Sequence, residues 1–269
     1  MAKPDNTLPG LCLFGDGRMS RALQEHARTH RIPITRVFTG DELRNGFPRK
    51  KGDLKGAVVG VDFSGAEAVA ANVHRAVELD LPLLVGTTGW QNMRAEVEAS
   101  VINGGGAVLY APSLSFAALV LFHLVRQAAW LFDADPAYDP WVVEQQHAAR
   151  RDVPGGAALH IGEILLDTVA RKNLLQIGPA AGPLAPNQLS IATARGGYAP
   201  GTHQVGFDGP GENLELIHRV RDRRVHAAGA VRAALWLRDR SGFFTIDDFM
   251  ADIFTGFDEQ RESPGTVEI

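Results

Sequence analysis

The sequence predicts an α/β protein with two domains, one built on a parallel sheet and one, of α+β type, built on a mixed sheet. In the first 115 residues, short apolar runs alternate with helical stretches, which is typical of a parallel sheet with helices on both faces. Beyond this point, a long helical pattern is followed by several strand patterns. Two of them flank Asp-Gly-Pro-Gly-Glu (208–212), a turn signal that joins antiparallel strands.

In the first part, buried strands are expected at the short apolar runs and helices in the stretches between them. The expected strands are 11–15, 34–38, 57–64, 81–88 and 107–113, and the expected helices are 18–30, 66–80 and 90–105. The segment 40–56 is polar and rich in Lys and Gly, so we expect a loop there. Ligands of parallel sheets bind at the carboxyl ends of the strands. Those ends carry Gly15–Ser20, Asp62–Ser64, Gly86–Gly89 and Pro112–Ser115.

In the second part, the helical and strand patterns no longer alternate regularly. Helices are expected at 116–132 and 156–171, with strands at 141–146, 189–196, 203–209 and 213–220. A Pro- and Gly-rich loop is expected at 178–187, and a helix returns at 227–240. The polar tail 258–269 is expected to be mobile.

The composition indicates a globular, cytoplasmic protein. The chain has 269 residues, 45% hydrophobic content and 22% charged residues, which is enough for a sizeable core. The net charge of -4 argues against a nucleic-acid partner. We expect no export signal and no membrane span, because the start lacks an apolar core and the apolar runs are short. With Cys12 as the single cysteine and no suggestive histidine spacing, we expect no metal site.

A glycine-rich loop follows the first expected strand and opens the first helix. Its pattern Gly15-x-Gly17-x-x-Ser20 is typical of dinucleotide-binding Rossmann-like folds, in which the helix N-terminus holds a pyrophosphate. An ordinary Gly-rich turn is the alternative. The acid that commonly binds the ribose at the end of the second strand is missing, since this strand ends at Thr39. We therefore favour NADPH over NADH. Arg36, Arg44 and Lys50-Lys51 are candidates for binding the 2′-phosphate of NADPH. The alternative is that these basic residues only form a solvated loop.

Several motifs in order resemble the 4-hydroxy-tetrahydrodipicolinate reductase family. They are "GRM" (17–19), "VDFS" (61–64), "VGTTGW" (85–90), "APSLS" (111–115), the block 144–163, "GTHQV" (201–205) and "GAVRAALWL" (229–237). The resemblance implies a nucleotide domain made from both chain ends (1–115 and 228–269) and a substrate and oligomerisation domain (116–227). It also implies a homotetramer and hydride transfer from NADPH or NADH to a ring with two carboxylates, in lysine and diaminopimelate synthesis. The implied cofactor contacts are Gly17, Arg18, Met19, Gly86, Thr87, Thr88, Ser113, Leu114 and Ser115. Gly15 of the glycine-rich loop and Thr39 at the end of the second strand are expected to contact the cofactor as well.

The family's substrate motif reads Glu-x-His-His-x-x-Lys-x-Asp-x-Pro-Ser-Gly-Thr-Ala, and this chain departs from it at four functional places. The first His, the family's proton donor, is Gln146, and the Lys is Arg150. The Ser and the Thr that hold a substrate carboxylate are Gly155 and Ala157. The phosphate loop also departs, because it is one residue shorter between its glycines and ends in Ser20.

These exchanges predict that carboxylate binding is kept while the usual acid is lost. Gln cannot donate a proton at neutral pH, and Arg stays protonated, but Arg is the better two-point clamp for a carboxylate. The implied catalytic residues are Gln146, His147 and Arg150, and the implied substrate contacts are His147, Arg150, Gly155, Gly156 and Ala157. His147 either replaces the missing proton donor or only forms a contact with a carboxylate or the backbone and donates no proton. We expect His203 to be a strand residue that bonds across the sheet.

The sequence therefore predicts a divergent NAD(P)H-dependent reductase that acts on a cyclic imine or an unsaturated amino acid carboxylate. One alternative is the ordinary lysine-pathway reductase with unusual residues. Another is a catalytically silent protein that binds a nucleotide or another ligand.

Overall fold

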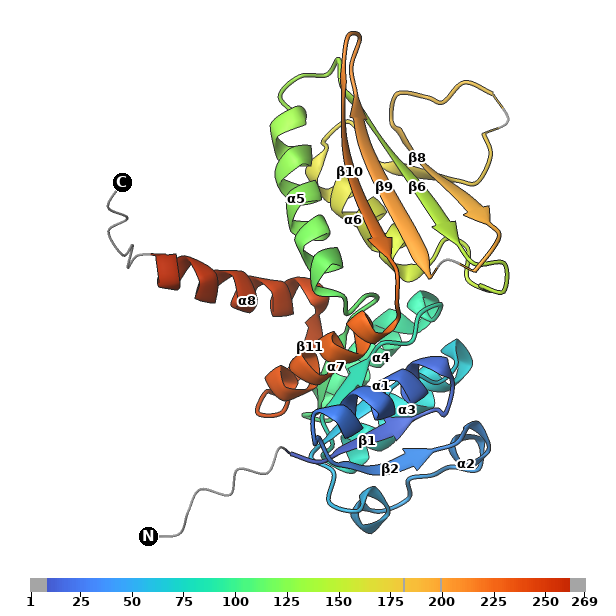
Figure 1. Cartoon of the computed structure of the whole chain (residues 1–269), viewed down its shortest axis with the longest axis vertical. Helices are drawn as coiled ribbons and strands as arrows, with labels where there is room; N and C mark the ends of the chain where they lie inside the picture. The colour runs from blue at the N-terminus through green and yellow to red at the C-terminus, as the bar shows by residue number, and fades with distance from the viewer. Residues whose placement is uncertain (1–8, 181, 199, 262–269) are drawn as a thin grey trace. The chain divides into compact units, whose positions relative to one another are not determined.

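The computed structural model describes residues 9–180, 182–198 and 200–261, and the chain divides into two compact units. The first unit consists of Met1–Ala111 and Ala230–Ile269, and the second of Pro112–Gly229. Each unit contains one sheet, six-stranded in the first and five-stranded in the second (Figure 1).

The sheet of the first unit is entirely parallel, as the alternating pattern predicts. Its strands run in the order β11-β5-β4-β3-β1-β2, and every neighbouring pair is parallel. Their bounds are β1 Leu11–Phe14, β2 Ile34–Phe38, β3 Val59–Asp62, β4 Leu83–Val85, β5 Ala107–Tyr110 and β11 Gly242–Thr245. The edge strand β11, which comes from the C-terminal part of the chain, was not predicted.

Helices lie between the strands of this sheet, and one helix follows the last strand. They are α1 Arg18–Thr29, α3 Val69–Glu78, α4 Arg94–Asn103 and α8 Ile246–Arg261, with single 3₁₀ turns η2 Ala66–Ala68 and η3 Gln91–Met93. The helix α7, Arg224–Leu237, begins in the second unit and continues into the first.

The prediction of a loop over 40–56 was wrong in part. The segment contains the helix α2, Gly40–Arg44, and the 3₁₀ turn η1, Lys51–Leu54. A capping box starts α2: the Thr39 hydroxyl accepts from the Glu42 amide, and the Glu42 carboxylate accepts from the Thr39 amide. Leu43 and Leu54 are buried in the core, which holds these short elements against the sheet.

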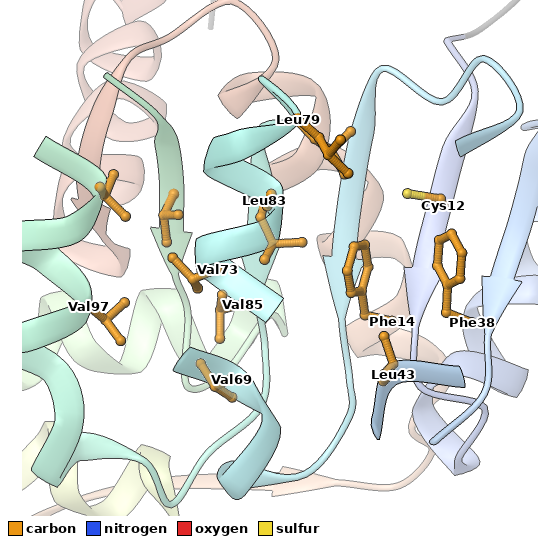
Figure 2. Packing of buried hydrophobic residues seen from close by; sticks show 14 of the residues in the cluster. Cys12, Phe14, Phe38, Leu43, Val69, Val73, Leu79, Leu83, Val85 and Val97 are labelled. Carbon is orange, nitrogen blue, oxygen red and sulfur yellow. The ribbon is translucent and has the colours of Figure 1, made fainter. Parts of the chain in front are cut away.

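The core of the first unit is formed by apolar side chains from the strands and from α2, α3 and α4. Figure 2 shows part of it, with Phe14 and Phe38 in tilted ring contact near Cys12, and Val73 and Val97 from the helices. Burial raises the pKa of the Cys12 thiol to about 12, although a backbone contact lowers it. Because the thiolate is the reactive form, Cys12 is a packing residue.

The sheet of the second unit is mixed, which confirms the predicted α+β pattern. Its order is β10-β9-β6-β8-β7, in which β6, β7 and β8 are parallel to one another while β9 is antiparallel to β6 and β10. The bounds are β6 Asp139–Gln146, β7 Leu174–Ile177, β8 Gln188–Arg195, β9 Gly201–Asp208 and β10 Asn213–Val220. The helices α5, Phe116–Phe132, and α6, Gly156–Thr168, contact each other and pack on this sheet (Figure 1).

Three further predictions about elements need correction or qualification. The helix α6 ends at Thr168 rather than at residue 171, because Val169 is already extended. The strand β7 was missed, since it has only four residues and lies at the sheet edge. The expected tail begins inside α8, which continues to Arg261, and residues 262–269 lie outside the described part. Within the described ranges, no helix is both long enough and apolar enough to span a bilayer.

Candidate functional site

The glycine-rich loop adopts the tight turn that its sequence predicts. Gly15 has a φ of +99°, and a Cβ at this position would lie 2.7 Å from the Phe63 carbonyl oxygen. Only glycine tolerates both conditions. Gly17 is the extended N-cap of α1, and a Cβ there would meet nothing within 4 Å. The loop therefore leaves open space at the helix N-terminus, where a pyrophosphate would bind.

A cavity of about 410 Å³ lies beside this loop. It is lined by Gly15 and Gly17, by Gly40 and Arg44 of α2, and by Arg75 of α3. Asp16 and Glu67 also line it, so the wall carries charges of both signs. A cavity of this size and position fits part of a nucleotide.

The basic residues expected near the end of β2 have different environments. Arg44 lines the cavity and pairs with Asp41. Arg36 pairs with Glu42, and Lys51 pairs with Asp80 at 2.7 Å. Arg75 was not predicted, because nothing in its helical sequence distinguishes it from a solvated basic residue. Thr39 is occupied in capping α2.

Asp62, at the end of β3, organises the loops around the strand ends. Its carboxylate accepts hydrogen bonds from Ser64, from the Asn72 amide at 2.8 Å and from the Thr87 hydroxyl at 2.7 Å. Burial raises the pKa of Asp62 above its usual range, while these hydrogen bonds lower it. Since every contact is a donor to the carboxylate, the arrangement suits the ionised form. Thr87 is thus turned toward Asp62.

The other expected cofactor residues are distributed over both units. Arg18 and Met19 begin α1, and Gly86 lies against Phe63, whose ring would be 2.4 Å from a Cβ at that position. Ser113, Leu114 and Ser115 are buried and belong to the second unit, and Thr88 lies in the first.

A close backbone contact explains the glycine of the "GAVRAALWL" motif. A Cβ on Gly229 would lie 1.6 Å from the carbonyl oxygen of Leu114. The helix α7 can pack against the segment that leads into α5 only because Gly229 has no side chain.

The substrate motif begins on β6 and ends at the first turn of α6. Glu144 and Gln146 alternate with less buried residues along β6 and are both buried on one face. His147 follows the strand and is also buried. The amide of Gly196 donates to the carbonyl oxygen of Gln146 at 3.0 Å, which fixes the end of β6 beside β8.

Glu144 is a completely buried carboxylate that holds several parts of the motif together. It accepts from the Gly155 amide at 3.1 Å through both oxygens, from Arg195 at 2.8 Å and from the Gln146 amide at 3.3 Å. Burial raises the pKa of Glu144, but His203, Gly155 and Arg195 together lower it to about 2. Glu144 is therefore ionised throughout the neutral range.

The Arg150 guanidinium, expected to clamp a substrate carboxylate, engages Asp152. Arg150 donates to both oxygens of Asp152, through Nε to one and through Nη2 to the other at 2.5 Å. The chain thus places a carboxylate of its own on one edge of the guanidinium fork. A substrate carboxylate must bind the other edge or replace Asp152.

The glycine exchange at 155 makes room for the neighbouring charged groups. A Cβ on Gly155 would lie 2.5 Å from Glu144 Oε1 and 3.1 Å from Arg150 Nη2. Gly155 is the N-cap of α6, and its amide already binds Glu144. Gly156 and Ala157 form the buried first turn. The expected anion at this helix end is therefore supplied, at least at Gly155, by the protein itself.

Arg195 is a site residue that sequence analysis missed. At the end of β8 its Nη2 donates at 2.8 Å both to Glu144 and to the carbonyl oxygen of Asp152. It thereby ties β6 to the loop that carries Arg150. The only available signal was its position directly before Gly196-Gly197, at the carboxyl end of a strand.

Two histidines continue the polar face on the neighbouring strands. His203 of β9 is opposite Glu144 and His218 of β10 is opposite His203. The two rings are stacked, with centroids 6.1 Å apart. His203 Nε2 lies 3.7 Å from Glu144 Oε1, a contact across the sheet that is longer than a typical direct hydrogen bond. No group of three potential metal ligands occurs among the described residues.

Comparison with known proteins links these features to one family. Residues 117–250 match the family described as "Dihydrodipicolinate reductase, C-terminus". The chain is 34% identical over 250 residues to the 4-hydroxy-tetrahydrodipicolinate reductase of Ralstonia nicotianae, which covers 90% of each chain. It is 32% identical over 259 residues to the corresponding protein of Zymomonas mobilis, covering 93% of this chain and 99% of that one.

Solved structures show the same fold. A dipicolinate-bound dihydrodipicolinate reductase from Paenisporosarcina sp. TG-14 has a TM-score of 0.65 at 15% identity, covering 89% of this chain and 98% of its own. GenD2 from gentamicin A biosynthesis, in complex with NAD, has a TM-score of 0.56 at 12% identity, covering 89% of this chain and 88% of its own.

Proposed function

Because this chain belongs to the 4-hydroxy-tetrahydrodipicolinate reductase family, a family of NAD(P)H-dependent oxidoreductases, we propose that it reduces a cyclic imine or unsaturated ring carrying carboxylates. The parallel-sheet unit supplies the Gly15–Gly17 turn and the adjoining cavity for the nicotinamide cofactor. The second unit supplies the motif from Glu144 to Ala157 for the substrate. The nicotinamide would provide the hydride.

We further propose that the substrate differs from the lysine-pathway intermediate. The observation that carries this proposal is that Arg150 donates two hydrogen bonds to Asp152 and lies next to Gly155. The Glu144 carboxylate and the Arg150 guanidinium together fill the space that a side chain at position 155 would need. The carboxylate subsite therefore has another shape and another set of donors than a Lys, Ser and Thr would create. The substrate class that fits is a cyclic imino acid with at least one carboxylate.

The decisive experiment is NADPH oxidation against a panel of cyclic imino acids that includes the lysine-pathway intermediate. We expect turnover of a panel member and poor turnover of the intermediate. Ordinary rates with the intermediate would favour the standard lysine-pathway enzyme. The identity of 30–35% with 4-hydroxy-tetrahydrodipicolinate reductases supports this alternative. Stabilisation by NADPH without any turnover would favour a silent binding protein.

NADPH is the cofactor that we propose over NADH. Arg44 and Arg75 line the cavity beside the phosphate loop, and Thr39 stands where a ribose-binding acid would discriminate against a 2′-phosphate. The cavity also contains Asp16 and Glu67, so the preference depends on the two arginines. Dissociation constants for both cofactors test it: Arg75→Gln should weaken NADPH binding and leave NADH binding nearly unchanged.

A homotetramer formed through the second sheet is also proposed. The face opposite α5 and α6 places Trp141 and Val143 of β6 beside Gln204 of β9 and Ile217 of β10, and Ile217 is 40% exposed. Among the described residues, α5 and α6 are the helices that contact this sheet most extensively. Light scattering after size-exclusion chromatography would test the assembly, and Ile217→Glu should dissociate it.

A further inference from the structure

A row of polar side chains crosses one face of the second sheet at the end where the substrate motif begins. Glu144 of β6, His203 of β9 and His218 of β10 occupy opposed positions on three adjacent strands (Figure 1). Their neighbour Gln146 lies on the same face, two residues further along β6. It fits there because the opposite residue is Gly201, where a Cβ would be 2.9 Å from Gln146 Nε2.

Gln146 and His203 meet at the same carboxylate oxygen. Gln146 Nε2 lies 3.3 Å from Glu144 Oε1, and His203 Nε2 lies 3.7 Å from it. Gln146 is 4% exposed and His203 is 5% exposed. Gln146 Oε1 and His203 Nε2 nevertheless have no hydrogen-bond partner in the described part of the chain. Two such atoms in one buried cluster call for an ordered water or a ligand group, because an unsatisfied polar atom is costly to bury.

The proposed reduction needs a proton that Gln146 cannot supply. The substrate takes up a hydride, with its electron pair, on one atom of the double bond, and a proton on the other. We propose that His203 supplies this proton through a water molecule held at Gln146 Oε1. The Nε2–H bond of His203 breaks and its electron pair stays on the ring. The water passes a proton to the substrate, and solvent restores the proton on His203. This inference rests on the proposed function.

The surrounding charges suit His203 for this role. It faces the Glu144 carboxylate from β6, the His218 ring from β10 and His226 from α7, with Arg150 also near His226. Burial, and then His203, lower the pKa of His218, and burial followed by neighbouring positive groups lowers the pKa of His226 to about 4. The lowered pKa values favour the neutral form of both rings, and Glu144 is the anionic group beside His203.

A proton-linkage experiment tests the inference without requiring turnover. Dipicolinate carries a ring nitrogen between two carboxylates and stands in for the substrate. Its binding to the wild-type protein with NADPH, followed by calorimetry in buffers of different ionisation enthalpy, should be accompanied by proton uptake. His203→Gln should abolish this uptake, while His218→Gln should retain it. Equal uptake in His203→Gln, or loss of uptake in His218→Gln, overturns the inference.

Kinetics with the best substrate of the panel provide the second readout. His203→Gln should lower kcat by about 10²-fold or more, as expected for loss of a positioned acid, with KM changed by less than about threefold. Free imidazole should restore part of the activity of His203→Ala. A kcat within threefold of the wild type overturns the inference. Absence of any turnover in the wild type instead refutes the proposed function, and the calorimetric result still decides whether His203 takes up a proton.

Discussion

Replacement of Arg195 by Gln tests the network that supports the substrate motif. Arg195 pairs with Glu144 at 2.8 Å, and their side chains are 17% and 0% exposed. The same nitrogen holds the carbonyl oxygen of Asp152. In Arg195→Gln the carboxylate stays buried but loses its cationic partner, which is the costly way to break an ion pair.

The expected magnitude follows from the pKa of Glu144. The fold lowers it from 4.5 to about 2, and each unit corresponds to about 1.36 kcal/mol. The ionised form is thus stabilised by roughly 3 kcal/mol, shared among Arg195, Gly155 and His203. We expect Arg195→Gln to lower the free energy of unfolding by about 2 kcal/mol at pH 7, somewhat below the usual cost of breaking a buried pair.

The pH dependence separates this effect from a general packing defect. Because the folded-state pKa of Glu144 is depressed, its stabilisation is fully present above pH 4.5 and is lost as pH falls toward 2. In the variant the carboxyl protonates at higher pH, so the difference from the wild type should shrink at pH 3.5.

Urea unfolding at pH 7.0 and pH 3.5 measures this difference. Arg224→Gln is the matched control, because Arg224 pairs with Asp222 at 2.5 Å in an exposed position, where such pairs contribute little. A loss below about 0.5 kcal/mol at pH 7, or an equal loss at both pH values, would refute the argument that Glu144 depends on Arg195.

Three further outcomes are expected. Gly229→Ala should destabilise the protein by about 3 kcal/mol in thermal or urea unfolding, since the new Cβ meets the backbone of Leu114 and overpacking of this kind is costly; a change below 1 kcal/mol would contradict the close contact. Asp62→Asn should weaken the thermal stabilisation by NADPH, because a carboxylate that accepts four donors cannot be replaced by an amide. Gly15→Ala should abolish cofactor binding while Gly17→Ala weakens it less, as titration of NADPH fluorescence would show.

The fold class was predictable because it depends on local periodicity. Strands β1, β3 and β5 are short apolar runs, buried at every position, and the intervening sequences are helical. The elements that were missed are those whose stability comes from neighbours. The four-residue strand β11 is paired with β5, and α2 exists because Leu43 is buried and Thr39 caps the helix.

The sequence by itself determined the parallel and mixed sheets, the glycine turn at Gly15 and the exchange of residues in the substrate motif. Only the tertiary structure showed that Arg150 is held by Asp152, that Arg195 supports Glu144, and that His203 and Gln146 both approach the same Glu144 oxygen. The physical reason is range. Helices, strands and turns are determined by residues that are close in the sequence, whereas the partners of a buried carboxylate depend on which strands the fold brings together.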